Sequence, residues 1–274
     1  MIRIRQFDTG TESTRQSFDL TDRGLLLGDG VFDTSMVRNG QIILMEDHLS
    51  RLAGDCDALG IQIEVQELRA FAMEAVPTGG NGALRLTVTR GPGPRGLSPG
   101  AFGPATLISK FDAGNPAFPA VPARIMTSDI HRNPSAPSSR HKTLAYTDTV
   151  IGMERAKSAG YDDALYLAPD GHVTCSSIAN IFARFGNELV TPPLEDGVLK
   201  GVMRGWLLAK AAEAGLQARV ASLQSKDLRK ADALYLTNSL QLVRAVSTLD
   251  DMRFDTEIPS RLHDMCASLA GLPA

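Results

Sequence analysis

The sequence is poor in the residues from which disulfide scaffolds and metal sites are built. Its three cysteines, Cys56, Cys175 and Cys266, lie far apart and form no CxxC pair. Neither a disulfide framework nor a thiolate zinc site is therefore expected, and a reducing cytoplasm fits this cysteine usage. The five histidines show no HExxH or HxH spacing, so we expect no metal.

Charge of one sign and long apolar runs are also scarce. The formal net charge is −3, and charged residues make up 22% of the chain, so no basic excess attracts nucleic acid. No apolar run approaches the ~20 residues that cross a bilayer. The opening MIRIRQFDTG alternates charged and aliphatic residues, unlike a signal peptide. We expect a soluble globular protein with neither nucleic-acid nor membrane partners.

The length of the chain favours two domains. Its 274 residues exceed a single core of roughly 100–150 residues. The stretch FDAGNPAFPAVPAR contains three prolines and one glycine, as a linker does. We predict a small N-terminal α/β domain over residues 1–112, a linker over 113–122, and a larger domain over 123–274.

Hydrophobic periodicity predicts the fold class, which is α/β in the broad sense of mixed sheets with helices packed on them. EDHLSRLAGDCDALG places Leu49, Leu52, Cys56 and Leu59 on one helical face, and ALRLTVTR alternates as a strand. Further helices are expected at roughly 146–159, 201–214 and 259–270. The motif DALYL occurs at 163–167 and again at 232–236, which predicts two buried strands of one sheet.

Three polar stretches are candidates for binding anions. GPGPRG, residues 91–96, is followed by LSPGAFGP and not by the helix that a dinucleotide site needs. Bracketed by Arg90 and Arg95, it either holds a carboxylate or is a solvated turn. EDGVLKGVMRGW leads into an amphipathic helix and LTNSL ends a buried strand, and both fit either an anion site or ordinary caps.

Two single residues are also notable. Lys142 stands where the polar loop HRNPSAPSSRH meets a predicted helix, and not on a repeating solvated face. Cys175 lies in GHVTCSSIANIF among small hydroxyl residues. A cysteine in a strand usually packs as a small hydrophobe, and this reading competes with a functional one.

Seven motifs, in this order, carry a resemblance that spans nearly the whole chain: DRGLLLGDGVFDT, HLSRL, RLTVTRGPGPRG, RHKTLAY, VTCSSIANIF, DGVLKGVMR and LTNSLQLVRAV. They resemble the class IV pyridoxal-phosphate enzymes, which include branched-chain and D-amino-acid aminotransferases and 4-amino-4-deoxychorismate lyase. The resemblance implies the two-domain fold type IV. It also implies pyridoxal 5'-phosphate between the domains and a homodimer in which the second subunit completes the site.

The resemblance also implies residue roles. Lys142, in the larger domain, is expected to bind the cofactor covalently and then to act as the general base. The other cofactor-binding residues are expected to be Arg51 and Ser239 with Asn238 at the phosphate, Val202 and Met203 through their backbone N–H groups, and Cys175 and Asn180. The substrate, a small amino compound, is expected to contact Phe32, Thr34, Arg90 and Arg95.

TRGPGPRG and TNSLQLVRAV look more like the lyase branch, so the resemblance favours release of pyruvate to leave 4-aminobenzoate. The alternatives are a transaminase acting on D-amino acids, branched-chain amino acids or primary amines, and a protein that binds the cofactor without turnover. Two positions depart from the family. Ala145 replaces a common asparagine, and Cys175 replaces the glutamate that pairs with the ring nitrogen of the cofactor. The thiol is a weaker partner, which makes the ring a weaker electron sink.

Overall fold

The structure, a computed structural model, describes residues 2–5, 18–97, 104–115 and 118–272. The chain divides into two units, and each is described by itself. Unit 1 comprises Met1–Pro116 and His141–Ala145, and unit 2 comprises Ala117–Arg140 and Tyr146–Ala274. The change from the first unit to the second falls within the predicted linker 113–122, of which residues 116 and 117 lie outside the described part of the chain.

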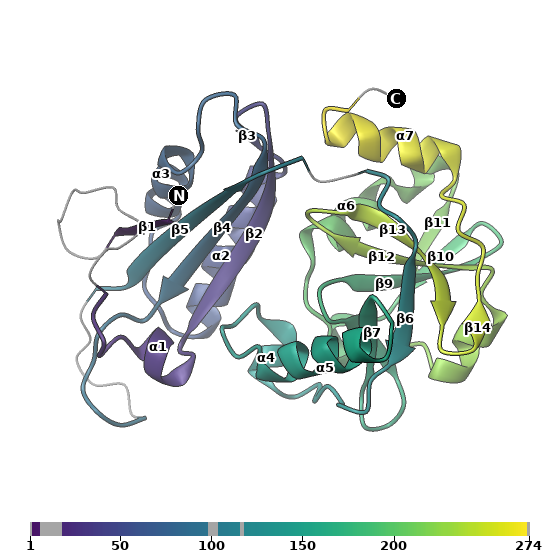
Figure 1. Cartoon of the computed structure of the whole chain (residues 1–274), viewed down its shortest axis with the longest axis horizontal. Helices are drawn as coiled ribbons and strands as arrows, with labels where there is room; N and C mark the ends of the chain where they lie inside the picture. The colour runs from purple at the N-terminus through teal and green to yellow at the C-terminus, as the bar shows by residue number, and fades with distance from the viewer. Residues whose placement is uncertain (1, 6–17, 98–103, 116–117, 273–274) are drawn as a thin grey trace. The chain divides into compact units, whose positions relative to one another are not determined.

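Unit 1 is an antiparallel sheet with the strand order β1-β5-β4-β2-β3 and with α2 and α3 along one face (Figure 1). The predicted helical face of α2 is confirmed, since Leu49, Leu52 and Cys56 are buried against α3 and the sheet. Its elements are β1 (Ile2–Arg5), α1 (Arg23–Leu27), β2 (Gly30–Arg38), β3 (Gln41–Ile42), α2 (Met45–Ala58), α3 (Val65–Glu74), β4 (Gly82–Thr89) and β5 (Thr106–Ala113).

The pairing of β2 with β4 sorts their side chains between the two faces of this sheet. Directly opposed residues share a face, and faces alternate along each strand. Asp33 opposes the core residue Leu86, so Asp33 lies on the face that α2 covers. Phe32 opposes Thr87 and Thr34 opposes Arg85, so these side chains lie on the other face.

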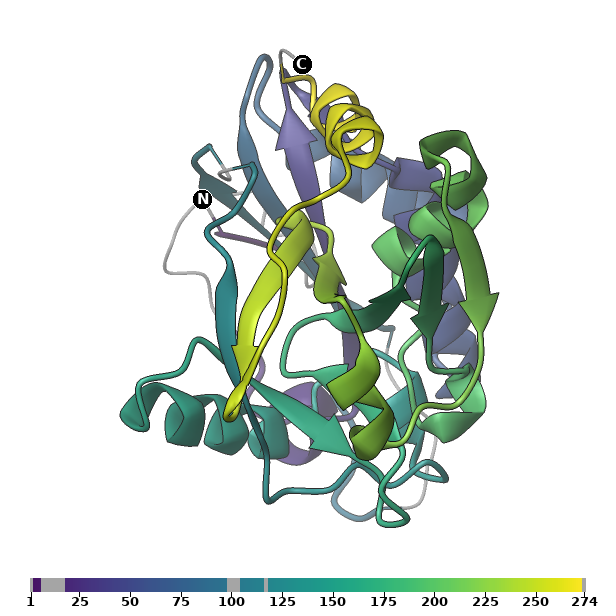
Figure 2. The same cartoon turned by 90° about the vertical axis from the view of Figure 1, so that its right-hand side faces the viewer.

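Unit 2 is built on a closed ring of strands. The path β9-β12-β13-β6-β7-β8 returns to its start because β8 also pairs with β9, through Cys175 and Asn180. Figure 2 shows the resulting curled sheet. Strands β10 and β11 extend it beyond β9. Its strands are β6 (Ala123–Thr127), β7 (Asp163–Leu167), β8 (Val173–Ser176), β9 (Asn180–Phe185), β10 (Glu188–Thr191), β11 (Gln217–Val220), β12 (Ala233–Asn238), β13 (Leu242–Leu249) and β14 (Met252–Arg253).

Helices lie close to their predicted positions in unit 2, and the two DALYL copies form β7 and β12 of one sheet, as predicted. Side chains of the ring, among them Ile125, Leu165, Ile181 and Leu234, form its core. The helical segments are α4 (Pro137–Arg140), α5 (Thr147–Ser158), η1 (Leu194–Asp196), α6 (Val202–Lys210), η2 (Ala211–Ala214), η3 (Ser225–Lys230) and α7 (Ser260–Leu269).

The placement of Lys142 in the larger domain is wrong. The segment His141–Ala145 belongs to unit 1, although the chain on both sides of it belongs to unit 2. The segment lies along the edge of β2, where Phe32 N donates to Lys142 O at 2.9 Å and Leu144 N donates to Gly30 O at 2.9 Å. Backbone pairing over more than 100 residues of sequence decides this membership, and local patterns do not reveal it.

Candidate functional site

Lys142 lies beside an aromatic ring on the face of the unit 1 sheet opposite α2. Its Nζ is 4.4 Å from the centroid of the Phe32 ring, and Cζ of Arg85 is 3.6 Å from the same centroid. Thr34 opposes Arg85 across the strands. The structure thus brings together Lys142, Phe32 and Thr34, and it adds Arg85, a second cation that sequence reasoning missed. Arg85 occupies a polar position of the alternating strand ALRLTVTR, which is the signal that points to it.

Arg51 is held by a buried carboxylate on the helix-covered face. Its Nε and Nη2 donate to Asp33 Oδ2 at 2.9 and 2.7 Å, and Nδ1 of His48 lies 2.6 Å from the other oxygen, Oδ1. Burial by itself raises the pKa of the Asp33 carboxyl. The charges of Arg51 and His48 and their hydrogen bonds outweigh burial, and the pKa of Asp33 is about 2. The carboxylate therefore stays ionised and fixes the orientation of the guanidinium.

Three polar residues form a row across neighbouring strands of unit 2. Cys175 of β8 opposes Asn180 of β9, and Asn180 opposes Thr237 of β12. Opposed side chains share a face of the sheet, so the three lie side by side where β8 and β12 end and β9 begins. Cys175 Sγ is 3.7 Å from Thr174 Oγ1. The row joins two predicted residues to Thr237, which sequence reasoning missed.

Asn180 ties this row to the start of α6. Its Nδ2 donates to Leu199 O at 2.9 Å. A Cβ placed on Gly201 would lie 1.9 Å from Asn180 Oδ1, so only glycine fits there without displacing the amide. Gly201 is the N-cap and makes no side-chain cap bond, and Val202 and Met203 are the first two helical residues. Their backbone N–H groups have no partner within the helix, which suits an anion.

The polar side chains at the end of β12 differ in their hydrogen bonding. Asn238 Oδ1 accepts from the backbone N–H groups of Leu240 and Gln241 at 3.0 and 2.8 Å, so this oxygen closes its own turn. Ser239 is half-buried in that turn. Thr237 Oγ1 is buried and makes no hydrogen bond within the described part of the chain. A buried hydroxyl without a partner is costly and fits a missing ligand atom.

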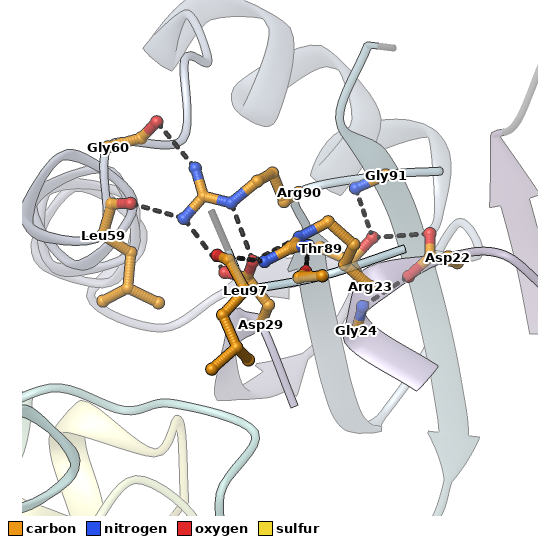
Figure 3. Close-up of polar contacts among 11 residues, drawn as sticks. Asp22, Arg23, Gly24, Asp29, Leu59, Gly60, Thr89, Arg90, Gly91 and Leu97 are labelled. Carbon is orange, nitrogen blue, oxygen red and sulfur yellow. Dashed lines mark hydrogen bonds and ion pairs between the residues drawn. The ribbon is translucent and has the colours of Figure 1, made fainter. Parts of the chain in front are cut away.

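Arg90 is committed to contacts within unit 1 (Figure 3). It donates to both oxygens of Asp29, with Nε at 2.8 Å and Nη2 at 3.0 Å, and to Leu59 O and Gly60 O at 2.6 and 3.0 Å. Arg23 binds the same carboxylate at 2.9 Å. Burial raises the pKa of Asp29, but hydrogen bonds from both arginines outweigh it and hold the pKa below its usual range.

This network occupies the guanidinium of Arg90, which the resemblance to the family assigns to the substrate. The guanidinium of Arg90 is occupied, so we do not retain it as a substrate ligand. Instead it joins the end of α2 to the loop after β4, to which Arg23 also donates through Gly96 O at 2.8 Å. Arg95 is exposed in that loop, and no local pattern distinguishes the two arginines. Their difference depends on Asp29, more than 60 residues away.

The described residues offer neither a metal site nor a membrane span. No group of three histidine, cysteine, aspartate or glutamate side chains is placed to hold a metal ion in that part of the chain. Among the same residues, no helix combines the length and the apolar character that a membrane span needs.

The chain is similar to proteins of one known family. The profile of a family described as amino-transferase class IV matches residues 30–249. A Methanocaldococcus jannaschii protein, provisionally named a branched-chain-amino-acid aminotransferase, is 30% identical over 84% of this chain and 81% of its own. A Mycobacterium tuberculosis protein, named bifunctional aminodeoxychorismate lyase and D-amino acid transaminase, is 28% identical over 85% and 86%. The structure of 4-amino-4-deoxychorismate lyase from Pseudomonas aeruginosa superposes with a TM-score of 0.81, at 28% identity, over 98% of both chains.

Proposed function

This chain belongs to the class IV aminotransferase family, and from that premise we propose that it is a cytoplasmic 4-amino-4-deoxychorismate lyase, which releases pyruvate and leaves 4-aminobenzoate. It is a pyridoxal-phosphate-dependent enzyme of fold type IV. The observation that carries the lyase reaction is the thiol of Cys175 in the row with Asn180 and Thr237. The likeness to the Pseudomonas aeruginosa lyase supports the same choice.

The donors in both units fit a phosphorylated cofactor. Arg51 offers a guanidinium oriented by Asp33, and the start of α6 offers backbone N–H groups beside Gly201. The unpartnered hydroxyl of Thr237 is a third donor, and it supports a phosphate near the predicted Asn238 and Ser239. All of these groups favour an anion. We assign the phosphate to Arg51, to Val202 and Met203 through their N–H groups, and to Thr237 with Ser239.

Lys142 is the residue that attaches the cofactor and moves the proton. The cofactor supplies an electron sink for the carbon that carries the amino group of the substrate. Lys142 Nζ would hold the cofactor and, with the substrate amine bound in its place, would take the proton from that carbon. Loss of this proton and cleavage of the C–O bond to the enolpyruvyl group would leave an aromatic ring, and the released enolpyruvate would become pyruvate by taking up a proton at carbon. Phe32 and Thr34 line the same face of the sheet as Lys142, and Arg85 is the cation there that suits a substrate carboxylate.

Cys175 favours elimination over transfer of the amino group. A carboxylate beside the ring nitrogen of the cofactor would keep it protonated, whereas a thiol is a weak donor and acceptor. Transfer requires the negative charge to persist until a carbon of the cofactor is protonated. Elimination expels its leaving group as soon as the proton departs, so a weaker electron sink hinders it less.

A transaminase is the second candidate. The Mycobacterium tuberculosis relative is named for both activities, which shows that one chain of this kind is credited with both. The same lysine and phosphate donors would serve, and the substrates would be a D-amino acid, a branched-chain amino acid or a primary amine with a keto acid. A cofactor-binding chain without turnover is the third possibility.

Product analysis separates these candidates. The purified protein is incubated with 4-amino-4-deoxychorismate, and separately with D-alanine or a branched-chain amino acid plus 2-oxoglutarate. Equal amounts of pyruvate and 4-aminobenzoate support the lyase, and glutamate formed in the second reaction alone overturns it.

Borohydride treatment should fix the cofactor to Lys142, and Lys142→Ala should abolish the visible absorption band and turnover. Cofactor fixed to Lys110 or Lys200 would overturn the assignment of the lysine.

The proposal includes a homodimer, which an apolar surface around α1 supports. Leu20, Leu25, Leu26, Leu27 and Leu97 are between 47% and 81% exposed. The hydrogen bond from Arg23 Nη2 to Leu97 O, at 3.3 Å, holds the last of them beside α1. Exposed leucines gathered around one short helix are typical of an interaction site. We call these five residues the α1 surface and assign it to the contact with the second copy.

A further inference from the structure

Lys142 lies in a short segment that is attached to unit 1 only by contacts along its length, because the chain on both sides of it belongs to unit 2. The chain enters the segment His141–Ala145 from unit 2 and returns to unit 2 after it. Its backbone pairs with the edge of β2 at Phe32 and Gly30, and Val31 and Thr143 form an isolated antiparallel bridge. One strand edge is a weak anchor for so short a segment, because few hydrogen bonds resist its opening.

The carboxylate of Asp55 supplies a second anchor from the last turn of α2. Its Oδ2 accepts from the backbone N–H of Lys142 at 3.1 Å, and its Oδ1 lies 2.8 Å from Nδ1 of His141. Asp55 is buried, whereas the His141 side chain is 31% exposed. A buried carboxylate needs such partners, and both of those it finds here belong to the segment that carries Lys142.

We propose that Asp55, together with His141, is a positioning residue for Lys142, an inference that rests on the proposed function. The carboxylate fixes the backbone at Lys142, while the ring of Phe32 guides the side chain, whose Nζ lies 4.4 Å from its centroid. Neither Asp55 nor His141 is assigned any contact with substrate or cofactor.

The same helix orients the other cofactor group of unit 1. Arg51 precedes Asp55 by four residues on α2, which is about one turn or ~6 Å along the helix axis. Arg51 is the phosphate ligand and Asp55 holds the residue that attaches the cofactor. Helix α2 therefore sets the spacing between these two attachment points, because a helix is far stiffer than the segment 141–145. Loss of the Asp55 carboxylate therefore frees the backbone at Lys142 and leaves Arg51 in place.

The first test needs no cofactor. Hydrogen exchange of the cofactor-free protein is followed in peptides that contain residues 141–145, for the wild type, Asp55→Ala and Asp57→Ala. Asp57 is an exposed acid on the same helix and serves as the matched control. Asp55→Ala should raise exchange in this segment about tenfold through loss of a charge-assisted hydrogen bond, with peptides of β4 and β5 unchanged. Asp57→Ala should leave the segment as in the wild type.

The second test measures attachment of the cofactor. Pyridoxal phosphate is added to each cofactor-free protein, borohydride is added after increasing times, and labelled peptides are quantified. Asp55→Ala should slow labelling of Lys142 about tenfold, while retention of unreduced cofactor through its phosphate changes little. His141→Gln removes one of the two contacts and should give an intermediate rate. Asp55→Asn keeps an acceptor for the Lys142 N–H and should restore part of the loss.

Each outcome decides the inference. Unchanged exchange in segment 141–145 overturns it, and so does faster exchange with labelling at the wild-type rate, since Asp55 would then be structural only. Should Asp55→Ala fail to fold, Asp55→Asn and His141→Gln decide in the same way. Failure of the proposed function is distinguishable. Absent labelling of Lys142 in the wild type itself would show that the cofactor is not attached there, whereas failure of the lyase reaction alone is seen in product analysis and leaves the labelling of Lys142 unchanged.

Discussion

Single residues carry the chemistry of this protein, and two of them take their properties from specific neighbours. Asp33 is ionised in a buried place because Arg51 and His48 flank it. Cys175 pairs with Asn180 where β8 meets β9 and closes the ring of strands. It is buried there, and it also belongs to the row that Asn180 and Thr237 continue. Its packing role and its proposed influence on the cofactor are therefore separable only by substitution.

Replacing the thiol tests that influence. Cys175→Glu should raise the rate of amino-group transfer relative to elimination, because a charged pair with the ring nitrogen contributes roughly 1.5–3 kcal/mol more than a thiol contact. The measurement is the half-reaction with an amino donor, compared with pyruvate release. Ser176 does not substitute for the carboxylate, since its hydroxyl lies 3.4 Å from Ala179 O and 3.1 Å from Ala179 N. A variant that transfers amino groups no faster than the wild type returns Cys175 to a packing role alone.

Acid should weaken unit 1 through Asp33. Its pKa is about 2 in the folded protein against an ordinary value of 3.8, so its contribution to stability is present above pH ~4 and is lost as the pH falls towards 2. At about 1.4 kcal/mol per pKa unit, the contribution is about 2 kcal/mol. In urea unfolding between pH 2 and 7, the free energy of unfolding of the wild type and of Asp57→Asn should fall as the pH falls. Because other carboxyls with a lowered pKa, such as Asp29, also contribute, Asp33→Asn should show a fall that is smaller by about 2 kcal/mol. An equal fall in Asp33→Asn would refute the assignment.

At the scale of elements, the start of α6 depends on a close contact between backbone and side chain. Asn180 Nδ2 binds Leu199 O, and its Oδ1 occupies the space that a Cβ on Gly201 would need. The strand β9 thereby sets the point at which α6 begins. The first N–H groups of the helix are aimed by this contact, and not by a capping side chain.

Gly201→Ala should therefore displace Asn180 and misplace the helix start. We expect a loss of about 1–3 kcal/mol in the free energy of unfolding and weaker retention of the cofactor phosphate. Gly205→Ala is the matched control, since Gly205 is exposed on the same helix and a Cβ there meets nothing within 4 Å. It should stabilise the protein by up to ~1 kcal/mol, the difference in helix propensity. Equal effects of both substitutions would contradict this account.

At the scale of the whole molecule, the α1 surface is where association should be tested. Leu26→Lys places a charge on exposed leucines and should weaken the dimer tenfold or more, as burial of one leucine contributes about 1.5–3 kcal/mol. Sedimentation over a range of concentrations measures this. Val220→Lys, at an exposed apolar residue of β11, is the control and should leave association unchanged. A wild type that stays monomeric at every concentration would remove the dimer from the proposal.

Local patterns in the sequence predict most of the helices and strands, and the motifs predict the family. Leu49, Leu52 and Cys56 predicted the buried face of α2, and the two DALYL copies predicted strands of one sheet, since local periodicity reports which side of an element is buried. The motifs also predicted Lys142, whereas nothing local showed that its segment joins unit 1.

Contacts between residues far apart in the sequence follow from the tertiary structure. Closure of the ring set Cys175 beside Asn180 and Thr237, and pairing with Asp29 removed Arg90 from the candidate substrate ligands. The anchoring of Lys142 by Asp55, 87 residues away, is of the same kind. A side chain chooses its partner by distance and direction in the folded chain, and periodicity along the sequence carries neither, because long-range pairing depends on how all the strands and helices pack at once.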